Sequence, residues 1–294
     1  MLNKKTLSFI VAATLSSFAF TFSSSAENQT YDTSRLVSIG GSLTEIVYAL
    51  GEEDRLIARD STSIEPEAAL NLPDVGYIRR LSAEGVLSVN PTAIIALEGS
   101  GPKEAVDVLE DASVPFITVP ETYDAEGIVM KIRKTGDALG VPEKADALIA
   151  QVKADISAAR FESEKSGAKD MRVLFVLSTK GGRIMASGSG TAADGIIKLA
   201  GALNVINEFQ GYKQLSDEAI IKAAHDAILM IDRGGDHSAV NEELFGYPSI
   251  AATPAGAQKN IVRMNGLYLL GFGPRTANAI RDLSKSLSGI KARM

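Results

Sequence analysis

The 294-residue sequence predicts an α/β protein built as two α/β lobes joined by a single long helix. Three observations support this fold class. Apolar, β-branched runs alternate with helical patterns in both halves, a long helical stretch separates the halves, and a short pattern recurs 134 residues later in the chain. Alternating strands and helices are typical of domains with a largely parallel sheet.

The first lobe is predicted to comprise residues 27–141. It contains three short apolar runs, each followed by a turn signal and then by a helical pattern. The expected pairs of strand and helix are 36–39 with 44–50, 93–97 with 103–111, and 116–119 with 125–139. Because each strand is followed by a helix, we expect these strands to lie in one parallel sheet.

The connecting helix is predicted over residues 142–169, which are rich in Ala, Lys, Glu and Asp. Pro142 stands at a plausible helix start, and Gly167 lies near the expected end. At ~1.5 Å per residue, a helix of this length spans ~35–40 Å, which is about the length of a small protein. We interpret it as a rigid connection between the lobes. The alternative is an ordinary surface helix within one domain.

The second lobe, residues 170–294, shows the same alternation at 172–177, 191–200, 227–231 and 276–287. It also repeats a pattern of the first lobe. Residues 81–87 (LSAEGVL) correspond to 215–221 (LSDEAII), and the strand 93–97 (AIIAL) corresponds to 227–231 (AILMI). In both copies a serine is suited to cap a helix, and a glutamate falls in the first turn. The constant offset indicates duplication or convergent lobe topology.

The first 26 residues have the pattern of a secretory signal peptide. Residues 1–5 are short and basic, 6–22 are apolar apart from scattered Ser and Thr, and Ser24, Ser25 and Ala26 are small residues suited to cleavage. A transmembrane anchor is the alternative, but the apolar core falls short of the ~20 residues that a span needs. The chain has no Cys, and therefore no lipid attachment site, disulfide or thiolate ligand. The sequence predicts an exported protein without a membrane anchor.

Charge and motifs argue against several function classes. The net charge is −6, and it becomes −8 when the signal peptide is removed with Lys4 and Lys5, which argues against nucleic acid as a partner. No G-x-S-x-G, P-loop or H-E-x-x-H motif is present, and the only histidines are His225 and His237. We therefore expect a protein that is not an enzyme, with an exported hydrolase as the alternative. His225 is expected to be structural, whereas His237 follows a strand and is a candidate ligand residue.

Residues 72–82 (LPDVGYIRRLS) form a loop in which Tyr77 lies between a glycine and two arginines. In an extended segment, Tyr77 and Arg79 project to the same side because side chains alternate. A neighbouring positive charge favours the phenolate form of a tyrosine, and a phenolate oxygen suits ferric iron. Taken alone, a tyrosine in such a loop is more often a surface or packing residue, so the pattern leaves both interpretations open.

Four motifs carry a resemblance to a known family. They are residues 36–46 (LVSIGGSLTEI), 72–79 (LPDVGYIR) running into 81–85 (LSAEG), 190–194 (GTAAD) and 266–275 (GLYLLGFGPR). With these motifs the sequence resembles the periplasmic haem-binding proteins of Gram-negative ABC haem importers, which belong to a class that also binds cobalamin and ferric siderophores. The resemblance runs from residue 35 to about residue 287. It implies two lobes joined by one long helix, with haem held in a ligand cleft between the lobes.

The resemblance also implies an iron ligand and its support. Tyr77 matches the tyrosine that ligates the haem iron, and Arg79 matches the arginine that supports the phenolate. Some members add a histidine in the loop that here spans residues 178–182, but no histidine is present there. Five-coordinate iron on Tyr77 is therefore expected, with His237 as the candidate second ligand.

Cations that bind the haem propionates are implied in the same way. Arg233 matches a position that pairs with a propionate, and a guanidinium suits this carboxylate because its N–H groups bind both oxygens. Lys180 and Arg183 are further candidates for a propionate. The alternative for these two residues is an ordinary solvated loop cation.

The repeated glutamates acquire a role through the resemblance, because one acid on each lobe docks onto arginines of the membrane permease in this class. By position these acids are Glu84 and Glu218. The alternative is that both only complement helix dipoles, worth ~0.3–1 kcal/mol each. The resulting hypothesis is a monomeric periplasmic protein for iron acquisition that captures ferric haem (hemin) and delivers it to an inner-membrane ABC permease and its ATPase. A carrier of ferric siderophores or cobalamin is the alternative.

Overall fold

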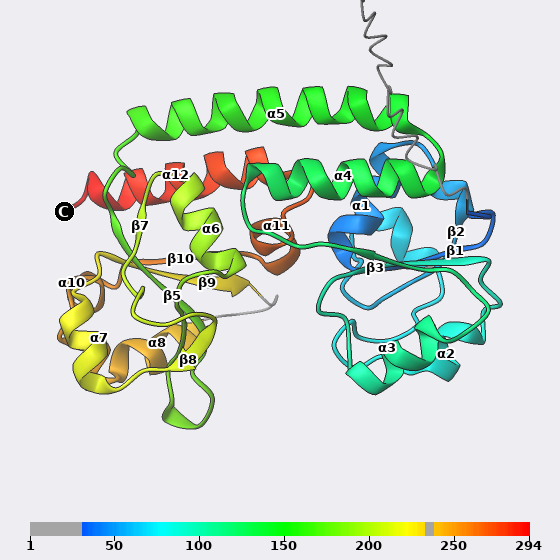
Figure 1. Cartoon of the computed structure of the whole chain (residues 1–294). Coiled ribbons are helices and arrows are strands. Elements are labelled where there is room, and N and C mark those ends of the chain that lie inside the picture. The colour runs from blue at the N-terminus through cyan, green and yellow to red at the C-terminus, as the bar shows by residue number, and fades with distance from the viewer. Residues whose placement is uncertain (1–30, 233–237) are drawn as a thin grey trace, which may run out of the picture.

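The computed structural model describes residues 31–232 and 238–294, and it confirms the predicted α/β architecture of two lobes joined by a long helix (Figure 1). The signal peptide predicted over residues 1–26 lies outside the described residues. Helix α5 (Pro142–Lys165) runs along one side of the molecule and extends over both lobes (Figure 1). Among the described residues, no helix has both the length and the hydrophobicity that crossing a membrane requires.

The N-terminal lobe is built on a four-stranded parallel sheet with the strand order β2-β1-β3-β4. The strands are β1 (Leu36–Ile39), β2 (Leu56–Arg59), β3 (Ala93–Leu97) and β4 (Phe116–Val119), and the α-helices are α1 (Gly41–Ala49), α2 (Ala83–Leu87), α3 (Lys103–Glu110) and α4 (Ala125–Leu139). Strands β1 and β3 are buried over their whole length, as expected for a parallel sheet covered on both faces. Every strand and helix predicted above for this lobe is present, whereas β2 is a strand that the sequence analysis missed.

The C-terminal lobe has a mixed sheet. Its strands are β5 (Arg172–Ser178), β6 (Met185–Ser187), β7 (Leu203–Asn204), β8 (Tyr212–Gln214), β9 (Ala227–Asp232) and β10 (Ile261–Asn265). Strands β5, β7, β9 and β10 pair in parallel, and β6 is antiparallel to β5 and β8. The helices are α6 (Ala192–Leu199), α7 (Asp217–Ala223), α8 (Ser238–Gly246), α9 (Pro248–Ala251), α10 (Pro254–Gln258), α11 (Gly266–Leu270) and α12 (Thr276–Lys291).

Helix α5 packs against one helix of each lobe, α4 and α12. It begins with Pro142 in its first turn, as predicted, and it ends at Lys165, four residues before the expected end. The crossing with α4 is close, because a Cβ added to Gly136 would lie 2.3 Å from the Cβ of Ala145. Apolar residues of α5 such as Ile149 and Ile156 belong to one core that reaches into both lobes. These contacts favour the connecting role over that of a surface helix of one domain.

The repeated sequence pattern folds into a repeated substructure. Ser82 caps α2 and accepts a hydrogen bond from the backbone N–H of Gly85 at 3.3 Å, and Ser216 caps α7 and accepts one from Ala219 at 3.2 Å. Each helix then leads into a buried central strand, β3 or β9. The serine caps expected from the sequence are therefore confirmed in both lobes.

An arginine pair extends this repeat beyond the matched sequence. Arg35 donates to the carbonyls of Val89 and Asn90 at 2.6 and 2.8 Å, at the end of α2. Arg172 donates to the carbonyls of Ala223 and Ala224 at 2.7 and 3.1 Å, at the end of α7. Residues 89 and 90 stand 134 residues before 223 and 224, which is the offset of the sequence repeat. Each lobe thus ties its short helix to the start of its first strand in the same way.

His225 is buried between α7 and β9, with no accessible surface. Its Nε2 lies 3.5 Å from the hydroxyl of Thr253, and its Nδ1 has no hydrogen-bond partner among the described residues. Burial, together with the positive charge of Arg172, lowers the pKa of His225 from 6.5 to about 4. The imidazole is therefore neutral at pH 7 and belongs to the packing of the C-terminal lobe.

Acidification is expected to destabilise the protein through this histidine. Between pH 6.5 and pH 4 the unfolded chain binds a proton at His225 that the folded chain does not bind, so the free energy of unfolding falls as the pH falls. From these values we expect His225 to account for a loss of about 2–3 kcal/mol between pH 7 and pH 4.5. Urea unfolding of the wild type and of His225→Gln at both pH values measures it. An equal pH-dependent loss in both proteins would contradict the prediction.

Candidate ligand-binding cleft

A cleft with a volume of about 890 Å³ lies between the two lobes, within the range typical of small-molecule sites. The N-terminal lobe contributes Gly40, Gly41, Ser42, Ser61, Thr62, Ile64, Tyr77, Ile78, Arg79, Leu97 and Glu121, and the C-terminal lobe contributes Ile231, Asp232, Asn265, Gly266, Leu267, Leu270 and Gly271. Three aliphatic side chains from each lobe are among these residues. A ligand with two large apolar faces is therefore able to bury these faces against the aliphatic side chains of both lobes.

Tyr77 lines this cleft, and its side chain is 42% exposed. The preceding Gly76 has φ +107°, a conformation that a residue with a Cβ rarely adopts. The N–H of Gly76 donates to Asp74 at 2.8 Å, Asp74 pairs with Arg59 at 2.9 Å, and the carbonyl of Gly76 accepts from the N–H of Ser61 at 2.9 Å. The segment before Tyr77 is thus tied to the end of β2.

Backbone hydrogen bonds also hold the segment after Tyr77. The carbonyl of Tyr77 accepts from the N–H of Arg80 at 2.7 Å, and Ile78 and Leu81 exchange backbone hydrogen bonds with Gly101 at 2.9 and 2.8 Å. Anchoring on both sides fixes the backbone of the loop that carries Tyr77 without help from a ligand. This preorganisation is what a preformed binding site requires.

Arg79 lies in the cleft with Tyr77, and its Nη1 is 3.4 Å from the carbonyl of Gly99. Burial raises the pKa of Tyr123 to about 12, and burial also raises the pKa of Tyr212, whereas the charge of Arg79 acts in the opposite direction on both. Tyr212 belongs to β8 of the C-terminal lobe. Arg79 is therefore within electrostatic reach of the opposite lobe.

The buried carboxylate of Asp60 fixes the wall of the cleft around the start of α1. It accepts hydrogen bonds from the N–H of Gly40 at 2.9 Å, from both the N–H and the hydroxyl of Thr62 at 3.0 and 2.7 Å, and from the hydroxyl of Ser63 at 2.7 Å. The loop after β2 is thereby attached to the loop after β1. Both loops contribute residues to the cleft.

Residues 36–266 match the family described as periplasmic binding protein, which accounts for most of the chain. The chain belongs to the periplasmic binding protein family. Members of this family are the substrate-binding components that work with the permease and ATPase of ABC transporters.

Solved structures with the same fold include two with substantial sequence identity. The periplasmic haem-binding protein BhuT, in complex with two haems, is 39% identical, with a TM-score of 0.82 over 87% of this chain and 98% of that chain. The apo form of the periplasmic haem-binding protein RhuT from Roseiflexus sp. RS-1 is 37% identical, with the same TM-score and coverage. The vitamin B12-binding protein of Pectobacterium carotovorum is 23% identical over 257 residues, which is 87% of this chain and 89% of that protein.

The structure brings together only part of the predicted site of this binding protein. Tyr77 and Arg79 line the cleft together. Arg233 and His237 lie outside the described residues, although Asp232, the last residue of β9, lines the cleft. Of the implied ligand-binding residues that the structure describes, Tyr77 and Arg79 therefore lie in one site.

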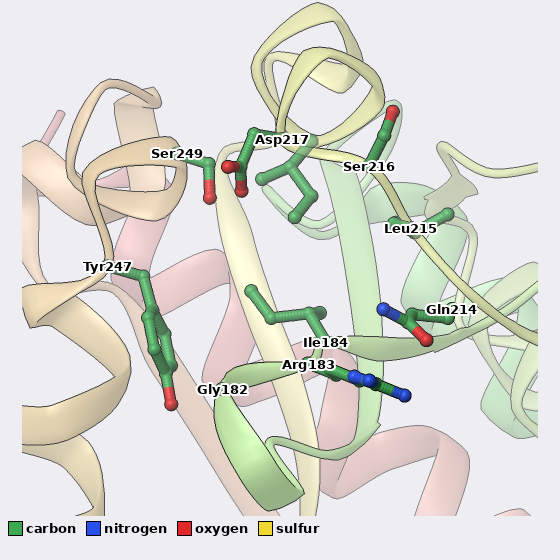
Figure 2. A pocket seen from close by; sticks show the side chains of 10 residues that line it. Gly182, Arg183, Ile184, Gln214, Leu215, Ser216, Asp217, Tyr247 and Ser249 are labelled. Carbon is green, nitrogen blue, oxygen red and sulfur yellow. The ribbon is translucent and has the colours of Figure 1, made fainter.

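Lys180 and Arg183 do not line the cleft. Lys180 is exposed at the start of the 3₁₀ turn Lys180–Gly182. Arg183 instead lines a separate hollow of about 260 Å³ within the C-terminal lobe, and Figure 2 shows its side chain at one end of this hollow and those of Asp217 and Ser249 at the other. The chain turns through Gly181 and Gly182, both with positive φ, between β5 and β6. Lys180 and Arg183 thus flank a tight turn, none of whose residues is in the cleft lining.

Glu84 and Glu218 are exposed in the first turns of α2 and α7. The two helices belong to different lobes and lie on the side of the molecule opposite α5 (Figure 1). Neither acid lines the cleft. The carboxylates of Glu84 and Glu218 are therefore both accessible to solvent, one on each lobe.

The walls of the cleft were not identified from the sequence. They follow the carboxyl ends of parallel strands, since Gly40 follows β1, Ser61 follows β2, and Leu97 and Asn265 end β3 and β10. Ligands of open α/β sheets bind at this edge. The signal was therefore present at the strand ends, but recognising the cleft required knowing that strand ends of both sheets line one site.

Proposed function

We propose that this binding protein captures ferric haem in the inter-lobe cleft and delivers it to an ABC importer of the inner membrane. The observation that carries the proposal is Tyr77, held by a preorganised loop beside Arg79 in a cleft with aliphatic side chains on both sides. The names of BhuT and RhuT, both above 35% identity, support haem as the ligand. In this proposal haem is cargo.

Tyr77 would ligate the iron through its phenolate oxygen, and Arg79 would stabilise the negative charge of that oxygen. The apolar porphyrin faces would pack against side chains such as Ile78 and Leu267 from opposite lobes. Arg233 would bind a propionate, and His237 remains the candidate second ligand. Because Lys180 and Arg183 do not line the cleft, a propionate would have to extend out of it to meet them.

Delivery would use the exposed acids Glu84 and Glu218, one on each lobe, which would meet arginines of the permease. The protein would act in the periplasm after removal of residues 1–26, as a monomer and without catalysis. Its net charge of −8 after removal of the signal peptide suits a cationic docking partner better than an anionic one.

Titration with alternative ligands tests the proposed cargo. Haemin added to the purified protein is expected to give a saturating tyrosinate-type, high-spin ferric spectrum. A cobalamin carrier of the same fold is the second candidate, favoured by the 23% identity to the vitamin B12-binding protein. Calorimetric titration with cyanocobalamin separates the two. Saturable cobalamin binding without a saturable haemin spectrum would replace haem by cobalamin as the ligand.

A further inference from the structure

Two of the sequence motifs that carry the resemblance to the family contain charged residues that the proposed function does not use. Glu45 belongs to the motif 36–46 and Arg275 to the motif 266–275, and neither lines the cleft. The structure joins them across the lobes. Arg275 Nη2 donates to one carboxylate oxygen of Glu45 at 2.7 Å and Nε donates to the other at 3.1 Å. The guanidinium also lies 5.3 Å from the ring of Tyr268, on its own lobe.

A second charged side chain, that of Lys131, also forms hydrogen bonds to residues of both lobes. Lys131 on α4 has no accessible surface, and its ammonium donates to Glu121 at 3.0 Å, to the hydroxyl of Ser42 at 3.3 Å and to the carbonyl of Gly271 at 3.0 Å. Ser42 and Glu121 belong to the N-terminal lobe, and Gly271 follows α11 of the C-terminal lobe. All three partners line the cleft. Lys131 therefore joins residues of both walls of the cleft through its three hydrogen bonds.

Glycines of one lobe lie close to side chains of the other lobe around these charges. A Cβ on Gly41 would lie 2.5 Å from a methyl group of Leu267, and a Cβ on Gly273 would lie 3.2 Å from a carboxylate oxygen of Glu45. Glu45 itself is only 8% exposed. Burial raises the pKa of Glu45 and lowers the pKa of Lys131, and in each case an oppositely charged partner acts against the shift. Removing Arg275 would leave Glu45 buried and uncompensated, which is strongly unfavourable, and removing Glu121 would do the same to Lys131. Arg275 itself is partly exposed and also lies 3.8 Å from Glu65.

We propose that Glu45, Arg275 and Lys131 form an inter-lobe joint that fixes the width of the cleft and so controls how slowly the ligand leaves. They are positioning residues, because Glu45 and Arg275 lie outside the cleft lining and Lys131 acts through Ser42, Glu121 and Gly271. The inference rests on one part of the proposed function, namely that the ligand binds in the cleft between the lobes. The separation of the lobes is a property of the empty protein and does not depend on which ligand is carried.

The test measures lobe separation without a ligand. Because the chain has no cysteine, Val108→Cys on α3 and Ile221→Cys on α7 would place one spin label on each lobe, at side chains that are 54% and 48% exposed. In Glu45→Gln and in Lys131→Met, the distribution of distances between the labels is expected to broaden or shift relative to the otherwise unchanged labelled protein. Haemin dissociation, followed by transfer to apomyoglobin, is expected to accelerate by about tenfold.

Arg281→Gln is the matched control. Arg281 pairs with Glu162 at 2.9 Å and joins α12 to α5, but it is not among the residues that line the cleft. Its substitution is expected to change neither the distance distribution nor the dissociation rate. If Glu45→Gln fails to fold by circular dichroism, Arg275→Lys applies the same test, because it keeps the charge but loses the two-point contact with Glu45.

Two outcomes would contradict the proposed inter-lobe joint. The first is an unchanged distance distribution in the folded variants. The second is a changed distribution with an unchanged rate of haemin release. A changed distribution in a protein whose wild type fails to bind haemin would instead support the joint and reject haem as the cargo, so the two proposals fail separately. A loss of thermal stability with no change in lobe separation would reduce these residues to a purely structural role and reject the inference.

Discussion

Tyr77→Ala is expected to abolish the tyrosinate-type absorption of haemin bound to the purified protein and to weaken haemin binding by at least about 100-fold. Loss of a supporting residue around a metal commonly costs 10–100-fold in affinity, and loss of the ligand itself is expected to cost at least as much. The remaining apolar walls would still retain some haemin without the characteristic spectrum. Visible absorption and fluorescence-quenching titration of the same samples measure the two effects separately.

Tyr247→Phe is the control for this substitution. The hydroxyl of Tyr247 donates to Glu243 at 2.7 Å, and the residue lines the hollow of Figure 2 and not the cleft. Its substitution is expected to leave the haemin spectrum unchanged. Arg79→Met is expected to give an intermediate effect, because it removes the charge that supports the phenolate but keeps the ligand. A wild-type spectrum in folded Tyr77→Ala would show that another residue ligates the iron.

Reversing the charge of Glu84 and Glu218 is expected to abolish coupling to the importer while haemin binding stays intact. If arginines of the permease receive these acids, Glu84→Arg and Glu218→Arg place like charges together at the interface, which costs several kcal/mol. Stimulation of ATP hydrolysis by a haem-type ABC importer in proteoliposomes is expected to fall by at least about tenfold for each substitution. The haemin spectrum is expected to stay unchanged, because neither acid lines the cleft.

Glu104→Arg gives a closely matched control for docking. Glu104 is exposed and occupies the second position of α3, as Glu84 does in α2 and Glu218 does in α7. All three substitutions therefore disturb a helix dipole alike, by ~0.3–1 kcal/mol. Equal loss of stimulation in all three variants would indicate a general charge effect. Full stimulation in both Glu84→Arg and Glu218→Arg would reject docking through these acids.

The elements that could be predicted from the sequence are those with a strong local pattern. Strands β1 and β3 are continuous apolar runs, which a sheet covered on both faces requires. Helix α5 begins at a proline and runs without interruption. Ser82 and Ser216 are followed two residues later by an acid in the first helical turn. In each case neighbours along the chain supply the interactions that form the element.

The elements that were missed depend on distant partners. Strand β8 (Tyr-Lys-Gln) is exposed at all three residues and becomes a strand only by pairing with β6. Strand β2 is four residues long, and its place at the edge of the sheet depends on β1. Helices α9, α10 and α11 have four or five residues each. Such short segments carry too little periodicity to be recognised without their tertiary contacts.

The sequence by itself determined the strands and helices with a strong local pattern, the repeat that gives each lobe a capped helix with an acid in its first turn, and the loop around Tyr77. These features depend on residues close together in the chain. Only the tertiary structure decided which side chains wall the cleft, that Lys180 and Arg183 lie away from its lining, and that Glu45 meets Arg275. The last two residues are 230 positions apart, and no local pattern encodes their contact, because it arises only when both lobes have packed against α5.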